Sequence, residues 1–255
     1  MRYSYFSDTD SMVRSLSIIG NLVSLLEFLI EDCECVDAGI GIYEGFLEEG
    51  LFLPTYVCIE LKGCKYSEPS VEPRYISILE DSLGCKVRLC CEEGYRDYLS
   101  YRELMSLGKD LIKNLTIRYL RPHLLKTKLT SIEYVLLVNR SGELVVLEGE
   151  RERVSLPMGF KVLENIVATS HTHPHGCFPS HKDLEHLELI MSHGGLGGAI
   201  LGPTCISLIV RRSMLLIDDV YLLREVIRRI KERNVRGVLG LFNRFKSIEI
   251  VMGSI

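Results

Sequence analysis

The chain has 255 residues, of which 47% are hydrophobic and 25% charged, with a formal net charge of -4 at pH 7. This balance is that of a globular protein with a buried core, and it excludes a disordered or fibrous chain. Acidic residues outnumber basic ones, so the overall charge gives no reason to expect nucleic acid as a partner. A chain of this length commonly forms one large or two ordinary domains, and we expect two.

The first strong pattern is a helix over residues 11–31, with Asp8 or Asp10 available as its N-cap. Asn21 and Glu27 interrupt its apolar residues, which is unlike the core of a signal peptide. The chain also has no uninterrupted apolar run of about 18 residues, the length that a membrane span needs. We therefore expect a cytoplasmic protein that does not span a membrane.

Short apolar segments follow, separated by Gly, Pro and Ser, and they predict a small α+β unit. They cover residues 39–46, 51–61, 75–79 and 85–91. The stretch 66–73, with two prolines and two serines, is the expected exposed loop.

Six of the nine cysteines form a loose group before residue 92: Cys33, Cys35, Cys64, Cys85, Cys90 and Cys91. Zinc sites favour pairs of cysteines separated by two to four residues, and this group has only Cys-x-Cys and Cys-Cys pairs. We therefore expect buried free thiols rather than a structural zinc. Disulfide bonds are the alternative if the source is hyperthermophilic. The absence of Gln is typical of a thermophile.

A second helix, over residues 101–119, is ended by Pro122, and we set the domain boundary near residue 100. Residues 1–100 are then an N-terminal α+β domain and residues 101–255 a second domain, so the fold class is mixed α+β. The second domain continues with a hairpin (strands 132–138 and 143–147), a short helix at 158–165, a buried strand at 166–170, a helix at 180–192, strands at 199–202 and 205–211, and a helix at 218–234. The last helix carries five basic residues, which Glu225 and Glu232 dilute, so we expect a solvated face.

The most informative stretch begins with His171 and His173, directly after the strand 166–170. Two histidines two apart on an extended chain project to the same side, so both imidazoles can reach one cation. Asp183, in the first turn of the next helix, is suited to be a third ligand. Two histidines and a carboxylate leave a fourth position for water, as in catalytic zinc sites. The sequence predicts one zinc per chain that activates water for hydrolysis, with Ser180 as the oxyanion donor.

Each of these residues also has a structural explanation. Ser180 and Asp183 form a common N-terminal signal of a helix, and a His-x-His pair arises often by chance. Their combination within thirteen residues, at the end of a strand, favours a site.

The same residues resemble the signature of the JAMM (MPN-plus) metalloproteases, which is a distant Glu, His-x-His-Pro, a short loop and Ser-x-x-Asp. The resemblance covers residues 101–233 at most. It implies a curved mixed sheet flanked by helices, a zinc held by two His and an Asp, and cleavage of peptide or isopeptide bonds. The substrate it implies is a protein conjugate, often one cleaved after the C-terminal glycine of a ubiquitin-like modifier.

The resemblance also implies a catalytic Glu from an earlier strand. Glu133, at the start of an apolar run, fits best, and Glu148 and Glu150 are rivals in a charged turn. One departure from the family lies in the loop, where six residues separate His173 from Ser180 instead of the usual seven, so the loop must close more tightly. Two further imidazoles, His175 and His181, lie close enough in sequence to replace a ligand or to bind substrate.

Other families with His-x-His fit poorly. An amidohydrolase barrel needs several more strand–helix units, and only 82 residues follow His173. A histidine-triad hydrolase alternates His with apolar residues, which Thr172 and Pro174 do not match. Two alternatives stay open: a non-catalytic MPN-type scaffold, and a JAMM-like hydrolase acting on a sulfur-carrier precursor or a small molecule. The role of residues 1–100 and homo-oligomer formation are also open.

Overall fold

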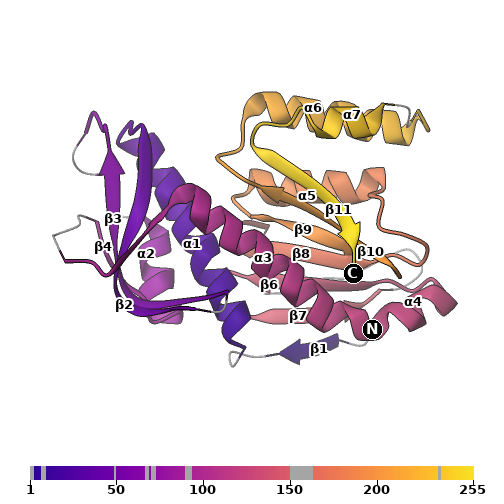
Figure 1. Ribbon diagram of the computed structural model, residues 1–255, viewed down its shortest axis with the longest axis horizontal. Helices are drawn as coiled ribbons and strands as arrows, with labels where there is room; N and C mark the ends of the chain where they lie inside the picture. Colours follow the sequence, from indigo (N-terminus) through magenta and orange to yellow (C-terminus); the bar gives the residue numbers. More distant parts are fainter. Residues whose placement is uncertain are drawn as a thin grey trace. The chain divides into compact units, whose positions relative to one another are not determined.

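The computed structural model describes residues 3–6, 10–48, 50–66, 69, 73–89, 94–149, 163–234 and 237–255. These residues form a mixed α+β protein with two mixed sheets flanked by helices, which confirms the predicted fold class (Figure 1). By its contacts the chain divides into two compact units. The N-terminal unit is Ser7–Leu111 with Arg140–Glu143, and the C-terminal unit is Met1–Phe6, Ile112–Asn139 and Leu144–Ile255. The division therefore falls inside helix α3 (Tyr101–Leu120), at whose start the sequence-based boundary was set.

The N-terminal unit is a four-stranded sheet packed against one long helix. The strands follow the order β4-β3-β2-β5, with β4 parallel to β3 and the other pairs antiparallel. The helix and strands are α1 (Ser11–Asp32), β2 (Asp37–Glu48), β3 (Leu51–Lys62), β4 (Lys86–Arg88) and β5 (Asp97–Ser100), and α2 (Arg74–Ser77) continues into a π-helical turn at Ile78–Ser82.

Helix α1 is the core element of this unit. Asp10 caps it by accepting a hydrogen bond from the Met12 amide at 2.9 Å, as one of the two predicted caps. By length and composition α1 could cross a membrane, but 78% of its most apolar 18-residue window is buried inside the protein. Such burial is that of a core helix, because the apolar surface is already covered by protein.

Among the described residues, the cysteines of this unit form no group whose sulfur atoms are close enough together to hold a metal ion. Cys33 and Cys85 are buried free thiols, as expected. Cys35 and Cys64 instead form a disulfide, the possibility that the sequence left open. Cys90 and Cys91, and most of the expected loop at 66–73, lie outside the described residues.

The C-terminal unit is built on a seven-stranded sheet of order β1-β7-β6-β8-β9-β10-β11, in which only the central β8–β9 pair is parallel. Its strands are β1 (Tyr3–Phe6), β6 (Tyr134–Asn139), β7 (Leu144–Glu148), β8 (Ile166–Thr172), β9 (Gly197–Leu201), β10 (Cys205–Arg211) and β11 (Ile248–Ser254). Its helices besides α3 are α4 (Leu124–Thr130), α5 (His181–Ser192), α6 (Ile217–Lys231) and α7 (Val238–Phe242), with 3-10 turns at Arg121–His123 and Leu163–Asn165.

Helices α5, α6 and α7 share one core with the sheet (Figure 1). Leu184 and Leu187 of α5 and Leu223 of α6 pack there with Ile200 and Ile209 of the sheet. The predicted hairpin β6–β7 and the predicted helices over α5 and α6 are present. Of the short helix expected at 158–165, residues 158–162 lie outside the described residues.

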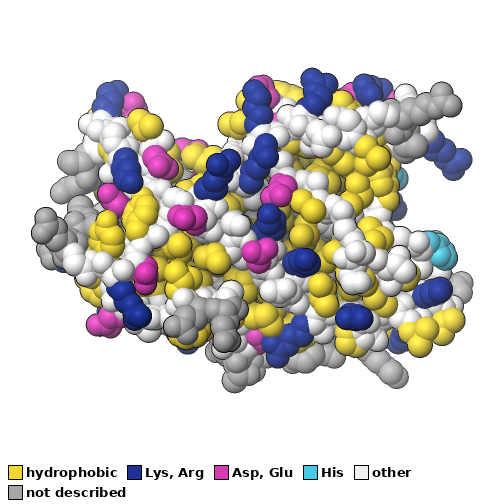
Figure 2. Space-filling model, in the orientation of Figure 1, with side chains coloured by type: hydrophobic (Ala, Val, Ile, Leu, Met, Phe, Trp, Pro, Cys, Tyr) yellow, Lys and Arg dark blue, Asp and Glu magenta, His cyan; other side chains and the backbone are white. Residues whose placement is uncertain are grey.

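Two of the basic residues of α6 are paired within the helix, and Arg224 contacts Glu188 of α5 at 2.7 Å. Arg228 contacts Glu225 and Glu232, each at 2.9 Å, and Arg229 contacts Glu225 at 2.7 Å. On the face drawn in Figure 2, basic side chains are likewise interspersed with acidic and apolar ones. This arrangement supports the interpretation of the basic face of α6 as solvated, while its apolar face packs in the core.

Candidate metal site

The two histidines reach the site on the central strand of the C-terminal unit. His171 on β8 pairs with Val135 on one side and Ile200 on the other. His173 lies just beyond the strand, where its amide donates a hydrogen bond to the Leu201 carbonyl at 2.9 Å and keeps the chain extended. Because side chains alternate along an extended chain, both imidazoles lie on the same side, as the spacing predicted.

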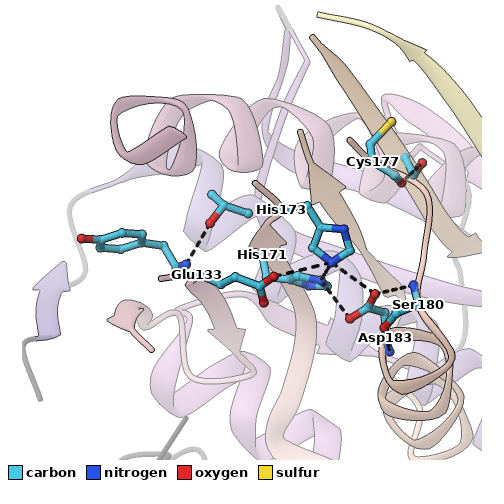
Figure 3. A network of polar contacts seen from close by, with 9 residues as sticks. Glu133, His171, His173, Cys177, Ser180 and Asp183 are labelled. Carbon is cyan, nitrogen blue, oxygen red and sulfur yellow. Dashed lines mark hydrogen bonds and ion pairs between the residues drawn. The ribbon is translucent and has the colours of Figure 1, made fainter. Parts of the chain in front are cut away.

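Asp183 joins them from the first turn of α5. The Nε2 atoms of His171 and His173 lie 3.1 Å apart. Asp183 places Oδ1 3.0 Å from the first imidazole and Oδ2 3.3 Å from the second (Figure 3). The three side chains are only 14 to 16% exposed.

These separations are suited to a metal ion. Ligand atoms about 2.0 to 2.1 Å from a tetrahedral zinc stand about 3.3 Å from one another. The two imidazole nitrogens lie 3.1 Å apart, and each faces a different oxygen of the Asp183 carboxylate, at 3.0 and 3.3 Å; all three separations are close to that value. Glu133, His171 and His173 also bring their ligand atoms within 4.8 Å of one another, a group that could hold a metal ion.

Glu133 lies at the edge of this cluster. Its Oε1 atom is 3.9 Å from His173 Nε2, and its side chain is 42% exposed. The separation exceeds that of two ligands on a tetrahedral zinc, so for that ion Glu133 is better suited to contact a water molecule at the site than to replace Asp183. Its rival Glu148 is held elsewhere, by Lys126 at 2.9 Å and by the Tyr134 hydroxyl at 3.0 Å. The other rival, Glu150, lies outside the described residues.

Ser180 and Asp183 also form the predicted capping box of α5. The Ser180 amide donates to Asp183 Oδ2 at 2.6 Å, and the Asp183 amide donates to Ser180 Oγ at 3.3 Å. The structural and the functional explanations therefore hold together, because the cap fixes the rotamer in which Asp183 faces the histidines. Ser180 acts as an acceptor in this bond, which leaves its hydroxyl proton for a second partner.

The opposite side of β8 carries buried hydroxyl groups. Thr172, between the two histidines, accepts a hydrogen bond from the Tyr134 amide at 2.9 Å and shares another with Thr127 Oγ1 at 2.9 Å. Ser170 shares one with Thr116 of α3 at 2.7 Å. Since Tyr134 follows Glu133, the Thr172 contact ties the start of β6 to the strand that carries the histidines.

The charges of the cluster stabilise one another. Burial opposes the ionised form of Asp183, but hydrogen bonds from His171 and His173 outweigh it and hold the pKa of Asp183 well below its ordinary value. Burial likewise opposes protonation of His173, yet the Asp183 carboxylate raises its pKa above the ordinary value. A metal cation can take the place of that proton, because a buried carboxylate prefers a positive neighbour.

The loop from His173 to Ser180 packs closely against the sheet. A Cβ at Gly202 would lie 2.5 Å from the Gly176 backbone, so the loop packs directly on the end of β9. Cys177 of the loop forms a disulfide with Cys205 of β10, and its carbonyl accepts a bond from Ser207 at 2.6 Å. No local spacing predicted this pair, although Cys177 and Cys205 are the two cysteines beyond residue 92.

Two cavities adjoin the cluster, and both reach Glu133, Lys182 and Asp183. The inner cavity, of about 380 Å³, lies between the sheet and α5 and is lined also by Val135, Leu137, Thr169, His171, His186, Leu187 and Ala199. The outer cavity, of about 630 Å³, is lined also by His173, Pro174, His175, Gly176, Phe178 and Ser180. The site is thus open on two sides.

Three further histidines near the site take different places. His175 lines the outer cavity, whereas His181 is the first residue of α5 and lines neither cavity. His186, which the sequence analysis did not single out, follows Asp183 by three residues on α5 and lines the inner cavity; burial lowers its pKa. Its helical spacing from Asp183 was the signal that could have found it.

Comparisons of the chain with protein-family models, with curated proteins and with solved structures found no match.

Proposed function

We propose that this protein is a zinc-dependent hydrolase of the JAMM type, which cleaves peptide or isopeptide bonds with a metal-activated water. The observation that carries the proposal is the cluster of His171, His173 and Asp183, whose ligand atoms lie 3.0 to 3.3 Å apart. A mere helix cap needs no such convergence of two imidazoles from a neighbouring strand.

The donor set favours zinc. Imidazole nitrogen suits zinc and its neighbours in the first transition series, whereas calcium and magnesium prefer oxygen ligands only. When bound, zinc supplies a Lewis acid that activates water at neutral pH and polarises a carbonyl group. His171, His173 and Asp183 would hold the ion, and a set of two imidazoles and one carboxylate is the donor set of catalytic rather than structural zinc sites.

Glu133 transfers the proton, and Ser180 stabilises the oxyanion. The Glu133 carboxylate, close to His173 and 42% exposed, receives a proton from the attacking water and returns it to the leaving amine. Ser180 donates its hydroxyl proton to the oxyanion that forms on the substrate carbonyl. The capping bond to the Asp183 amide holds the Ser180 side chain in place for this contact.

The resemblance to JAMM proteases adds a substrate class. We propose a protein conjugate, such as one with a ubiquitin-like modifier, as the substrate, and the cytoplasm as its location. The open outer cavity beside His173 and Ser180 supports access of a chain segment rather than of a small molecule alone.

A hydrolysis assay tests the proposal. Protein reconstituted with zinc is incubated with linear peptides and with peptides that carry a lysine isopeptide branch. We expect cleavage that a chelator abolishes and that Glu133→Gln lowers by about 10²- to 10⁴-fold, the usual contribution of a general base.

Glu148→Gln is the matched control, because this carboxylate lies on the neighbouring strand but is held by Lys126. It should leave the rate within about twofold, as expected for a surface ion pair. Equal rates in the Glu133→Gln variant and the parent protein would contradict the catalytic role of Glu133. No cleavage of any substrate by zinc-loaded protein would favour a scaffold.

A further inference from the structure

The inner cavity begins at the metal site and ends on apolar residues. Its metal end is formed by Glu133, His171 and Asp183. Glu133 lies just before β6 and Val135 is two residues further along the chain, so both side chains line the cavity on the side of α5. The cavity thus joins the proposed reaction centre to an apolar surface without any intervening element of the described chain.

The far end of the cavity is mostly apolar, although Thr169, which pairs with Leu137, and His186 of α5 also line it. Leu137 continues the same face of β6, and Leu187 lies one helical turn beyond Asp183 on α5. Both leucines are buried in the protein, and Val135 is half-buried at the cavity wall. Water in such a space contacts few polar partners, so displacing it by an apolar group is favourable.

The size of the cavity sets the size of the occupant. An engineered apolar cavity of about 150 Å³ holds a benzene molecule. The inner cavity, of about 380 Å³, has room for a leucine or phenylalanine side chain next to the polar groups at its mouth. A glycine residue would leave this space filled with water.

We infer that the inner cavity binds an apolar side chain, of the size of leucine or phenylalanine, on a substrate residue next to the bond that is cleaved. The inference rests on the proposed function and names its substrate class. It differs from the glycine that the family resemblance implies at this point, because a glycine makes no use of the Val135–Leu137–Leu187 wall. The apolar side chain takes the cavity, and the scissile bond lies at Glu133 and His171.

The expected preference can be given as a ratio. Complete burial of a leucine side chain favours binding by about 10- to 100-fold over glycine. This ratio should appear as tighter binding to the inactive enzyme and as a higher kcat/KM with the active one.

Binding is measured first, so that the inference is tested apart from catalysis. Isothermal titration calorimetry on the zinc-supplemented Glu133→Gln variant compares an all-glycine hexapeptide with peptides in which one leucine is moved position by position. We expect one position at which leucine tightens binding by about tenfold or more. Equal affinity for all the peptides overturns the inference.

Two substitutions at the cavity wall locate the effect. Val135→Phe fills the cavity and should reduce the affinity for the leucine peptide to that for the all-glycine peptide. Val135→Ala enlarges it and should shift the preference from leucine to phenylalanine. Val251→Phe, at an exposed position of β11, is the matched control and should keep the leucine preference. A leucine preference that survives both changes at Val135 also overturns the inference.

The same peptides are then given to the active zinc-loaded protein. Cleavage next to the preferred leucine supports the inference and the proposed function together. Cleavage at glycine and at leucine with the same kcat/KM overturns the inference but still supports the proposed hydrolase function. A leucine preference in binding without cleavage of any peptide supports the cavity as a binding site and counts against the proposed function alone.

Discussion

The two faces of strand β8 carry different chemistry within three residues. On the face toward α5, His171 is partly exposed, and it joins His173 and Asp183 in the candidate metal site. On the other face, Ser170 and Thr172 are buried, and each hydroxyl has a partner in a helix. The metal-binding side needs ligands that can exchange protons for an ion, whereas the hydroxyl side needs only fixed partners. The difference indicates that the second face supports the geometry of the first.

The largest effect should come from the face that carries the candidate metal site. His171→Ala removes a proposed ligand, and we expect zinc affinity to fall by more than about 100-fold, since even the loss of an outer contact costs about 10- to 100-fold. Competition with a chelator measures this affinity. Retention of zinc at parental affinity would show that His171 is not a ligand.

The next effect should come from the hydroxyl face. Thr172→Val keeps the shape of the side chain but leaves the Tyr134 amide and the Thr127 hydroxyl without this partner. We expect the free energy of unfolding to fall by about 1 to 3 kcal/mol, measured by urea denaturation. Zinc should still bind with one ion per chain, but kcat should fall, because the start of β6, which follows Glu133, is no longer tied to β8.

Thr172→Ser serves as the rescue, because it retains the hydroxyl group. It should recover most of the lost stability and of the hydrolytic rate. If the valine variant has parental stability and rate, Thr172 does not position Glu133.

A smaller effect is expected from Ser170→Ala, two residues away on the same face. It leaves Thr116 with its bond to the Ile112 carbonyl at 2.6 Å, so only one hydrogen bond is lost. We expect about 1 kcal/mol of destabilisation and no change in kcat. A fall in kcat equal to that of Thr172→Val would mean that the whole face, and not the Tyr134 contact, supports the site.

The smallest effect is a dependence on pH. In zinc-free protein the lowered pKa of Asp183 contributes stability above its ordinary value of about 4, and this contribution is lost as the pH falls. The raised pKa of His173 contributes stability below about 6.5, and this contribution is lost as the pH rises through the raised pKa.

The zinc-free cluster is therefore most stabilising between about pH 4 and 6.5, whereas zinc needs neutral imidazoles. We expect the gain in Tm on zinc addition to grow from about pH 6 to 8, as measured by differential scanning calorimetry. The gain should be absent in Asp183→Asn. A gain that shrinks as the pH rises would contradict the assignment of the imidazoles as ligands.

Local patterns in the sequence predicted much of the fold. The long helices α1 and α3 and the hairpin β6–β7 carry their own periodicity, so they could be found without knowledge of the tertiary structure. Helix α4 was missed because Pro122 predicted a stop. In the structure Pro122 lies in the first turn of a 3-10 helix, where its missing amide is tolerated, and α4 begins at Leu124.

Edge strands were missed for another reason. Strand β1 pairs with β7 far along the chain, so no nearby residue marks it. Strand β11 is exposed over its last four residues and lacks the alternation of a half-buried strand. Their pairing partners, rather than their own pattern, define these strands.

The same distinction between local patterns and tertiary contacts applies to the candidate site. His171, His173, Ser180 and Asp183 share one short stretch, so their spacing predicted the cluster that the structure brings together. The Thr172 contacts, the inner cavity and the Cys177 disulfide depend on residues brought in from other elements. No local spacing encodes such contacts, which is why the sequence did not predict them.

The most direct test of the central claim is the zinc content of protein purified without a metal-affinity tag, measured by inductively coupled plasma mass spectrometry beside the Asp183→Asn variant. This account predicts one zinc per chain in the parent protein and none in the variant. A parent protein that holds no zinc after supplementation, or a variant that keeps it, would contradict the account.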